Sequence, residues 1–241
     1  MTHVVALSGG KDSTALALRL TEMEPREYIY LCTPAGDELP EMVEHWAKLE
    51  KLLHRPLVRL TNRDLAFWIG EFKALPNWRM RWCTRKLKIE PTIAFLVKHQ
   101  PTTHYVGLRA DEEGREGIYG AAATVTRYPL REWGWGLAHV LTYLRERGVR
   151  IPRRTNCARC YDQRLNEWWD LWKNHPDLYA DAERQEEEIG ATFRGPNRDT
   201  WPAGLRELRA RFELGKIPRR ARVQGDLLDD DGEGPCRACT L

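Results

Sequence analysis

The sequence contains no long hydrophobic run. No stretch of its 241 residues approaches the roughly 18 consecutive apolar residues that a membrane-spanning helix needs. The first strand pattern begins so close to Met1 that no room remains for the basic and apolar regions of a secretory signal peptide. We therefore expect a cytoplasmic protein with no membrane partner.

The chain also has little excess of either charge sign. The chain carries 38 basic and 35 acidic residues and a formal net charge of +3, so its composition shows no overall nucleic-acid footprint. Locally, residues 145–154 and 206–222 are strongly basic and residues 226–233 are acidic. These stretches fit either solvated faces of a helix and a loop, or a contact with nucleic acid.

The six cysteines do not indicate a disulfide framework, because we expect the protein in a reducing compartment. In a reducing compartment, cysteines at such spacing indicate metal, cluster or redox groups. Four of them form two C-x-x-C pairs, at residues 157–160 and 236–239, and we return to these pairs below.

The stretch SGGKDS at residues 8–13 lies between an apolar run and a helical pattern. Residues 4–7 read as a short buried strand, and the leucines and alanines that follow Ser13 suit a helix. At such a junction glycine lets the backbone approach a ligand, and the unpaired amides and dipole of the helix favour an anion. The sequence therefore predicts a phosphate cradle, in which Lys11 adds a point charge and Asp12 holds Mg²⁺ or caps the helix. The cradle residues are Ser8, Gly9, Gly10, Lys11, Asp12 and Ser13.

Two common phosphate-loop motifs do not match this stretch. GxxxxGK[ST] requires a glycine where Val5 stands and a hydroxyl where Asp12 stands. GxGxxG requires separated glycines, whereas Gly9 and Gly10 are adjacent. An ordinary glycine turn with a capping serine stays open as an alternative. SGGKDS instead resembles, at every position, the SGGxDS pyrophosphate-binding loop (PP-loop) of ATP pyrophosphatases and phosphoadenylyl sulfate (PAPS) reductases.

The order of strand and helix patterns predicts an α/β fold. Strand patterns at 4–7, 28–33, 57–60, 103–108 and 123–130 alternate with helical patterns, which favours a Rossmann-like parallel sheet with helices on both faces. The loops at 8–13, 33–38 and 109–115 follow strand ends, where such sheets bind ligands. From about residue 155 strand patterns stop. We expect a PP-loop nucleotide-binding domain at 1–155 and a smaller helical, cysteine-containing subdomain at 156–241.

Further segments resemble the PAPS reductase family. TPAGDELPE at 33–41 is similar to its acidic loop, RWCTRKLKIEP at 81–91 to its cysteine-and-basic segment, and VGLRADEEGRE at 106–116 to its G-x-R-x-x-E-x-x-R motif. The P-L-x-x-W and C-x-x-C segments follow at 129–133 and 157–160. The resemblance implies that further residues contact the nucleotide, namely Thr33, Arg85, Lys88, Gly107, Arg109, Glu112 and Arg115.

Three departures from the family pattern bear on the substrate. The usual aspartate before Thr33 is missing, no E-C-G-x-H segment ends the chain, and Trp82-Cys83 stands where iron–sulfur reductases have two cysteines. The sequence therefore fits the family better than it fits sulfonucleotide reduction.

The resemblance implies an enzyme that binds ATP with Mg²⁺ and cleaves it between the α and β phosphates, adenylating an acceptor. Lys11, Asp12 and Arg109 are the candidate catalytic residues at the phosphates, and Cys83 is a candidate sulfur carrier or cluster ligand. Two alternatives stay open: a sulfonucleotide reductase whose nucleophile is Cys83, Cys236 or Cys239, and a nucleotide-dependent nucleic-acid-binding module without turnover. Candidate partners are a nucleic acid, a sulfur-donor protein and a second copy of the chain.

The two C-x-x-C pairs predict a metal site. Cys157 with Cys160 and Cys236 with Cys239 supply four thiolates, the set that structural Zn²⁺ prefers. The competing arrangement, which the resemblance implies, places Cys83 with Cys157 and Cys160 around a [4Fe–4S] cluster. A metal-free pair of redox-active dithiols is the third interpretation.

Overall fold

The computed structural model describes residues 1–60, 63–112, 114, 123–196 and 198–218. Five parallel strands form one sheet in the order β3-β2-β1-β4-β5. The strands are β1 (Thr2–Ala6), β2 (Tyr28–Cys32), β3 (Leu57–Arg59), β4 (Thr102–Tyr105) and β5 (Thr124–Arg127). The order reverses between β1 and β4, which confirms the predicted Rossmann-like α/β fold. Sheets of this kind bind ligands beyond the carboxyl ends of the strands at such a junction.

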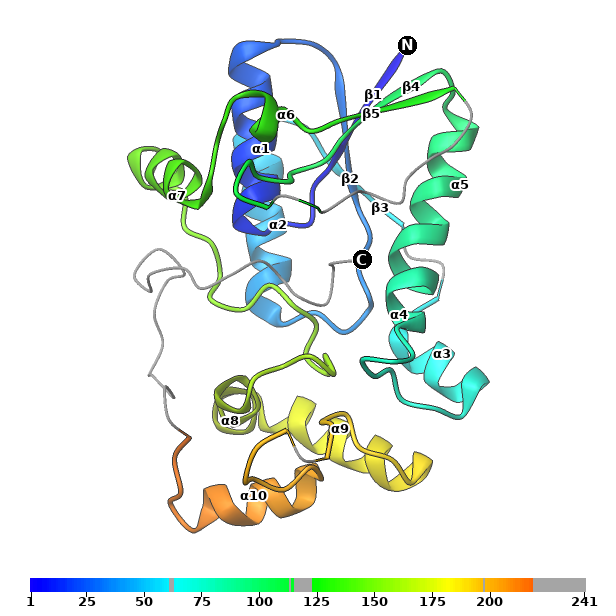
Figure 1. The fold of residues 1–241 in the computed structure, drawn as a ribbon, viewed down its shortest axis with the longest axis vertical. Coiled ribbons are helices and arrows are strands. Elements are labelled where there is room, and N and C mark those ends of the chain that lie inside the picture. Colours follow the sequence, from blue (N-terminus) through cyan, green and yellow to red (C-terminus); the bar gives the residue numbers. More distant parts are fainter. Residues whose placement is uncertain (61–62, 113, 115–122, 197, 219–241) are drawn as a thin grey trace.

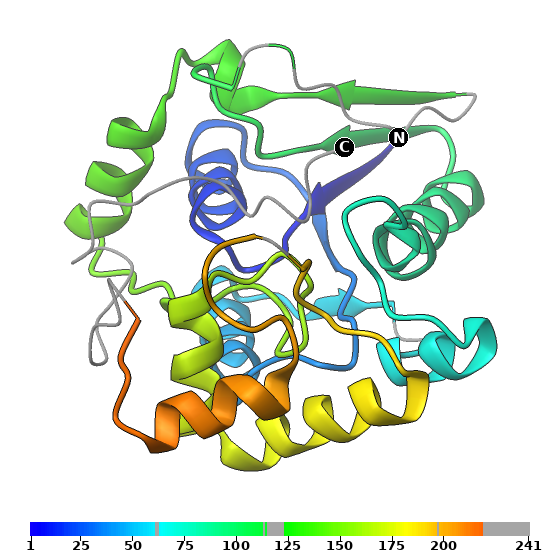
Figure 2. The same ribbon diagram turned by 60° about the horizontal axis from the view of Figure 1, so that its bottom comes forward.

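Helices cover both faces of the sheet because its central strands are apolar on both sides. Val5 packs with α1 (Lys11–Met23), α2 (Pro40–Leu53) and α7 (Leu137–Glu146) on one face. Val4 packs with Leu31 and with Leu96 of α5 (Glu90–Lys98) on the other. Figures 1 and 2 show α1 and α5 on opposite sides of the strands.

The crossover from β3 to β4 contains several short elements. Asp64 begins α3 (Leu65–Phe72) by accepting a hydrogen bond from the Phe67 amide at 2.7 Å, which is the expected N-cap interaction. α4 (Trp82–Thr84) then leads through one π-helical turn (Arg85–Ile89) into α5. Pro91 stands at the start of α5 and has no amide hydrogen, which accounts for the irregular hydrogen bonding before it.

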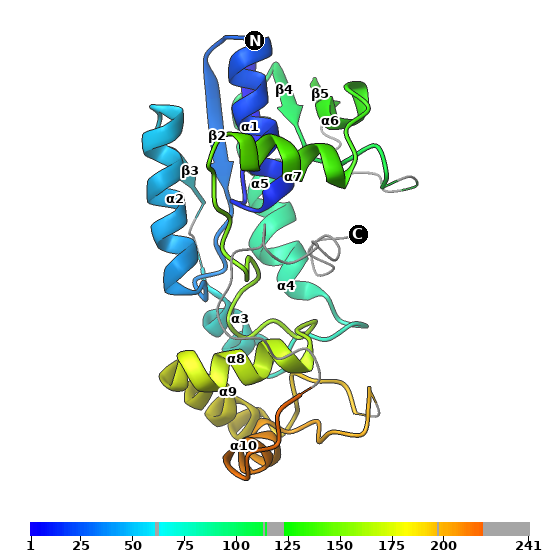
Figure 3. The same cartoon turned by 90° about the vertical axis from the view of Figure 1, so that its left-hand side faces the viewer.

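The C-terminal helices form a second layer below the carboxyl ends of the strands (Figure 3). After the short α6 (Pro129–Glu132) and α7 come α8 (Leu165–Asn174), α9 (Pro176–Ile189) and α10 (Leu205–Glu213). Their core surrounds Trp168, which is fully buried, and it also includes Leu65 of α3 and Leu87. Residues on both sides of position 155 thus share one apolar cluster, and the division at that position stays a prediction.

No helix in the described part of the chain is long and apolar enough to cross a bilayer. The strands and helices predicted from the sequence occur in the predicted order, with ends that differ by a few residues. β4 ends at Tyr105, which leaves the G-x-R motif in the loop beyond it.

Candidate functional site

The PP-loop connects β1 to α1 and depends on the conformation of Gly9. Gly9 has φ +88°, and a Cβ atom there would lie 2.7 Å from Nε1 of Trp46. That Trp46 nitrogen donates a 2.8 Å hydrogen bond to the Ser8 carbonyl. Only glycine adopts this left-handed conformation without a clash against the indole ring, which explains why glycine stands at position 9.

Serine hydroxyls tie the loop together. Ser8 Oγ and Ser13 Oγ lie 3.1 Å apart, Ser13 Oγ donates to the Gly10 carbonyl at 3.1 Å, and the Gly10 amide donates to Ser8 Oγ at 3.4 Å. Lys11 is the first residue of α1 and is only 7% exposed. The predicted cradle residues are therefore brought together at the amino end of α1, where amides and dipole favour an anion.

Asp12 and Arg109 join the loops that follow β1 and β4. Arg109 Nη1 donates to Asp12 Oδ2 at 2.9 Å, and the Arg109 side chain is only 5% exposed. Burial raises the pKa of Asp12, although Lys11 and Arg109 oppose the shift. The second oxygen, Oδ1, is buried without a hydrogen-bond partner among the described residues. A buried carboxylate oxygen without a donor fits a hard cation such as Mg²⁺.

The G-x-R-x-x-E motif forms the facing wall. A Cβ atom on Gly107 would come within 3.1 Å of the Asp12 carbonyl carbon, so glycine lets this loop lie directly on the first turn of α1. Glu112 accepts a 3.0 Å hydrogen bond from the Arg109 amide through Oε2. Arg131 supports the same loop by donating to the carbonyls of Arg109 and Glu112, at 3.3 and 2.7 Å.

The loop after β2 binds a carboxylate of its own chain. Glu38 accepts hydrogen bonds from the successive amides of Ala35, Gly36 and Asp37, at 2.5, 3.0 and 3.2 Å. Burial raises the pKa of Glu38. Thr33, the residue expected to contact nucleotide, lies half-buried directly after β2. The three amides hold the loop in a fixed shape beside the sheet.

Asp37 connects that loop to the first C-x-x-C pair. Its Oδ2 accepts from the Arg159 amide and its Oδ1 from Arg159 Nε, both at 2.7 Å, and its carbonyl accepts from the Ala158 amide at 2.6 Å. The Asp37 side chain is only 3% exposed. The knuckle between Cys157 and Cys160 is thus fixed to the carboxyl end of β2.

Cys83 belongs to the same apolar cluster as Cys157 of this knuckle. A hydrogen bond to Cys160, followed by burial, raises the pKa of Cys157 well above its usual range. Burial, with a contribution from Cys160, raises the pKa of Cys83. The positive charge of Lys88 opposes the pKa shift of both thiols. A bound metal would replace the thiol protons that these surroundings favour.

The predicted metal sites are only partly within the described residues. Cys236 and Cys239 lie outside them, as does Arg115. Within the described ranges, no three His, Cys, Asp or Glu side chains lie close enough together to hold a metal ion. The zinc and cluster hypotheses therefore stay predictions. Arg85, expected at the phosphates, pairs with Glu90 at 2.9 Å on an exposed surface.

Sequence reasoning missed three supporting residues. Trp46 holds the Ser8 carbonyl, Arg131 holds the β4 loop, and Asp111 accepts both from Arg109 Nε at 2.8 Å and from the Leu137 amide at 2.9 Å. Apart from the contact between Arg109 and Asp111, these hydrogen bonds join separate segments of the chain, and no local pattern indicates them.

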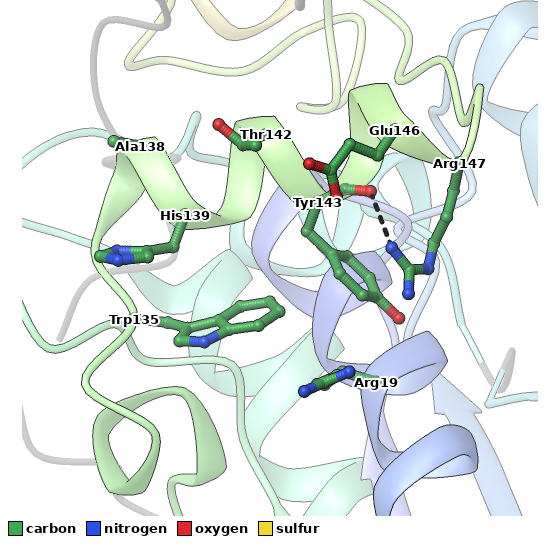
Figure 4. Close-up of a pocket in the computed structure, with 8 residues that line it drawn as sticks. All are labelled: Arg19, Trp135, Ala138, His139, Thr142, Tyr143, Glu146 and Arg147. Carbon is green, nitrogen blue, oxygen red and sulfur yellow. Dashed lines mark hydrogen bonds between the residues drawn. The ribbon is translucent and has the colours of Figure 1, made fainter.

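A separate cavity of about 500 Å³ lies between α1 and α7 (Figure 4). Arg19 lies 5.6 Å from the centre of the Trp135 ring, and Arg147 donates to the Tyr143 carbonyl at 3.4 Å. None of the residues expected to bind nucleotide lines it. The cavity is therefore separate from the PP-loop.

Three solved structures are similar to this chain to different extents. A PAPS reductase from Candida auris in complex with phosphate shares the fold, with a TM-score of 0.50 and 11% identity over 63% of this chain and 75% of that chain. The U34-tRNA thiolase NcsA from Methanococcus maripaludis with its [4Fe-4S] cluster gives a TM-score of 0.48 and 15% identity over 99% of this chain and 80% of that chain. A predicted subunit of a tRNA methyltransferase from Methanocaldococcus jannaschii gives a TM-score of 0.36 and 18% identity over 61% of this chain and 89% of that chain.

No curated protein matches the chain. The family model of the phosphoadenosine phosphosulfate reductase domain matches residues 2–153, which include the PP-loop, the G-x-R motif and all five strands. That match extends over more than half of the sequence. The chain therefore belongs to the phosphoadenosine phosphosulfate reductase domain family.

Proposed function

We propose that this protein binds ATP in the PP-loop and cleaves it between the α and β phosphates, transferring AMP to an acceptor. The observation that supports it most is the arrangement of side chains at the junction between β1 and β4. There the Gly9 turn opens the amino end of α1, and the Asp12–Arg109 pair closes the opposite side. This junction combines the amino end of α1, whose dipole favours an anion, with the cationic side chains of Lys11 and Arg109, which suits a polyphosphate.

The proposed step is an in-line displacement at the α-phosphorus. An acceptor oxygen forms a bond to that phosphorus, the bond from it to the oxygen bridging to the β phosphate breaks, and pyrophosphate leaves. The acceptor proton passes to solvent. Negative charge grows on the leaving pyrophosphate, and preorganised donors stabilise such charge most effectively where water is excluded. Lys11 and the first amides of α1 are the donors at this position.

Asp12 is the residue that would hold Mg²⁺. Its unpartnered Oδ1 provides a carboxylate ligand, while Oδ2 stays fixed by Arg109. When bound, the ion would neutralise charge on the phosphates. Arg109 then acts mainly by positioning Asp12, since Asp12 and Asp111 already occupy its Nη1 and Nε.

The cysteines would serve a later step of the same reaction. An adenylated acceptor is open to attack by sulfur or nitrogen, and Cys83 lies in the cysteine group near the carboxyl end of β2. In this proposal Cys157 and Cys160 bind Zn²⁺ together with Cys236 and Cys239, or bind a [4Fe–4S] cluster together with Cys83.

Anaerobic purification with zinc, iron and sulfide analysis distinguishes the two metal sites. One zinc without colour supports the four-cysteine site, and a brown protein with iron and sulfide supports the cluster.

The central test follows α-labelled ATP with candidate acceptors. The proposal expects labelled AMP, free or on an acceptor, with unlabelled pyrophosphate; labelled ADP would contradict it. Lys11→Ala should lower the rate by about 100-fold or more, as expected for loss of a charge that stabilises the transition state. Lys48→Ala, on the exposed face of α2, is the matched control and should keep the wild-type rate.

Sulfonucleotide reduction is the second candidate, since the matching family model carries the name of that activity. In that reaction a thiolate would attack the sulfate sulfur of PAPS or adenylyl sulfate, the bond from that sulfur to the phosphate oxygen would break, and the nucleotide would leave. A thiol donor would then form a disulfide with the same cysteine and release sulfite. Incubation of labelled PAPS and adenylyl sulfate with a thiol donor tests it. Sulfite release without ATP would favour the reductase over the adenylating enzyme.

A further inference from the structure

α3 and the segment after it present an unusual concentration of exposed apolar side chains. Phe67 is 38%, Phe72 42%, Trp78 67% and Met80 50% exposed, all within a short stretch of chain. Exposed apolar residues that occur singly need no explanation, whereas a contiguous group marks an interaction surface. In Figure 1, α3 and α4 lie together at the edge of the molecule. The α3 surface comprises Arg63, Phe67, Trp68, Phe72, Trp78 and Arg79.

The exposed rings are held in place. Trp68 stacks on Phe72 with centroids 5.2 Å apart, and Phe67 lies edge-on to Trp68 at 5.4 Å. The turn that carries Trp78 is fixed by Asn77, whose Oδ1 accepts from the amides of residues 79 and 80 at 3.0 and 2.9 Å. The rings therefore face solvent in a preorganised arrangement, which lowers the entropic cost of binding.

Positive charge surrounds these rings. Residues 63–86 contain six basic side chains, at 63, 73, 79, 81, 85 and 86, and two acidic ones, at 64 and 71. Arg63 lies 4.4 Å from the centre of the Phe67 ring, and Arg79 lies 4.7 Å from that of Trp78. The chain as a whole is nearly neutral, so this surface carries a local excess of positive charge.

We propose that the α3 surface binds a single-stranded segment of nucleic acid. Bases stack on exposed aromatic rings, and arginines beside those rings pair with the phosphates that connect the bases. A duplex hides the faces of its bases, and an acidic peptide supplies charge without flat rings. Only a single strand matches both the rings and the charge.

The α3 surface lies next to the segment that carries Cys83. Phe72 contacts Trp82 with centroids 5.2 Å apart, and Cys83 is the next residue along the chain. A strand lying on the surface would pass beside Cys83 and the knuckle. Binding itself requires no ATP turnover, while a role for the strand as the acceptor rests on the proposed function.

The test measures anisotropy of fluorescent oligonucleotides with the full chain. Single-stranded DNA, single-stranded RNA and the matching duplexes are titrated at several salt concentrations. We expect one or both single strands to bind more tightly than the duplexes, with affinity that falls steeply as salt rises. The two single-stranded arms distinguish DNA from RNA as the source of the ligand.

Variants locate the site. Trp78→Ala should weaken binding between about 5-fold and about 100-fold, because one stacked base is lost, and Trp78→Phe should keep most of the affinity. Arg79→Ala should weaken binding and reduce the slope of log affinity against log salt by about 0.7. The matched controls are Leu214→Ala and Arg206→Ala, at exposed positions in and after α10, and both should bind as wild type.

The outcomes separate this proposal from the preceding one. Lys11→Ala should lose ATP cleavage and keep oligonucleotide binding. No oligonucleotide binding, equal binding of duplex, or unchanged affinity in Trp78→Ala would overturn the nucleic-acid surface, and the first of these would favour a protein partner there. A loss in Arg206→Ala equal to that in Arg79→Ala would move the site to α10.

Discussion

Arg109 Nη1 lies 2.9 Å from Asp12 Oδ2, and this contact joins the loop after β4 to the first turn of α1. Both side chains are largely buried, at 5% and 17% exposed. The pair closes the junction where the strand order reverses, so the two loops keep a fixed spacing. Its loss should affect both stability and nucleotide binding.

Arg109→Ala should destabilise the protein by about 3 kcal/mol at neutral pH, because it leaves a buried carboxylate without its partner. Asp12→Asn in the same chain removes that charge. The double variant should therefore be more stable than Arg109→Ala alone, as measured by urea unfolding. Equal stability of the two variants would show that Asp12 carries no buried charge.

Gly9→Ala should lower stability by about 2 kcal/mol or more, since it combines a strained φ with a clash against Trp46. Gly10→Ala is the matched control. A Cβ atom on Gly10 meets only Ser8 Oγ at 3.6 Å and Thr155 Oγ1 at 4.0 Å, which are ordinary contacts. Thermal unfolding of the two apo variants measures the difference, and similar melting temperatures would refute the proposed reason for Gly9.

Asp37→Asn should loosen the C-x-x-C knuckle. The substitution keeps the size of the side chain and removes the charge that Arg159 pairs with, so Cys157 and Cys160 should open to solvent more often. Alkylation of the metal-free protein followed by mass spectrometry should show faster modification of both thiols. Cys32, buried in β2, is the internal control and should react as in the wild type.

The lowered pKa of the buried His104 side chain predicts that the protein loses stability in acid. Burial in β4 lowers the pKa of His104 to about 4 from its usual 6.5. Between these values the unfolded chain binds more protons than the folded one, so stability falls as pH falls from about 6.5 to about 4, by about 3 kcal/mol in total. Above pH 7 the effect is absent.

His104→Gln tests this pH dependence. The variant should be less stable at pH 7 and should lose less stability than the wild type between pH 6.5 and pH 4.5. His54→Gln, on the surface after α2, should keep the wild-type slope. Parallel curves for the wild type and His104→Gln would mean that another group causes the acid loss.

The sequence predicted those parts of the molecule that depend on local pattern. SGGKDS indicated a strand, a turn and a helix because its glycines, hydroxyls and flanking apolar residues act over a few positions. The alternation of strands and helices then implied the parallel sheet. The π-helical turn before Pro91 was not predicted, since the sequence appears there as one continuous helix.

The rest of the site depends on contacts between distant segments. Nothing near Asp37 indicates that it accepts from Arg159, and nothing near Ser8 indicates that Trp46 donates to its carbonyl. Arg85, which the family resemblance implies at the phosphates, pairs with Glu90 in this structure, and its role at a nucleotide stays a prediction. Side-chain direction at the surface is set by neighbours that a motif does not contain.

The contact between Asp37 and Arg159 also sets an order of assembly during synthesis. The two residues are 122 positions apart, so Asp37 leaves the ribosome long before Arg159. Chains emerge at about 5 to 20 residues per second, and amino-terminal segments generally fold first. The cysteine knuckle is therefore synthesised after the β2 loop that it contacts, and its thiols stay open to solvent until Arg159 pairs with Asp37.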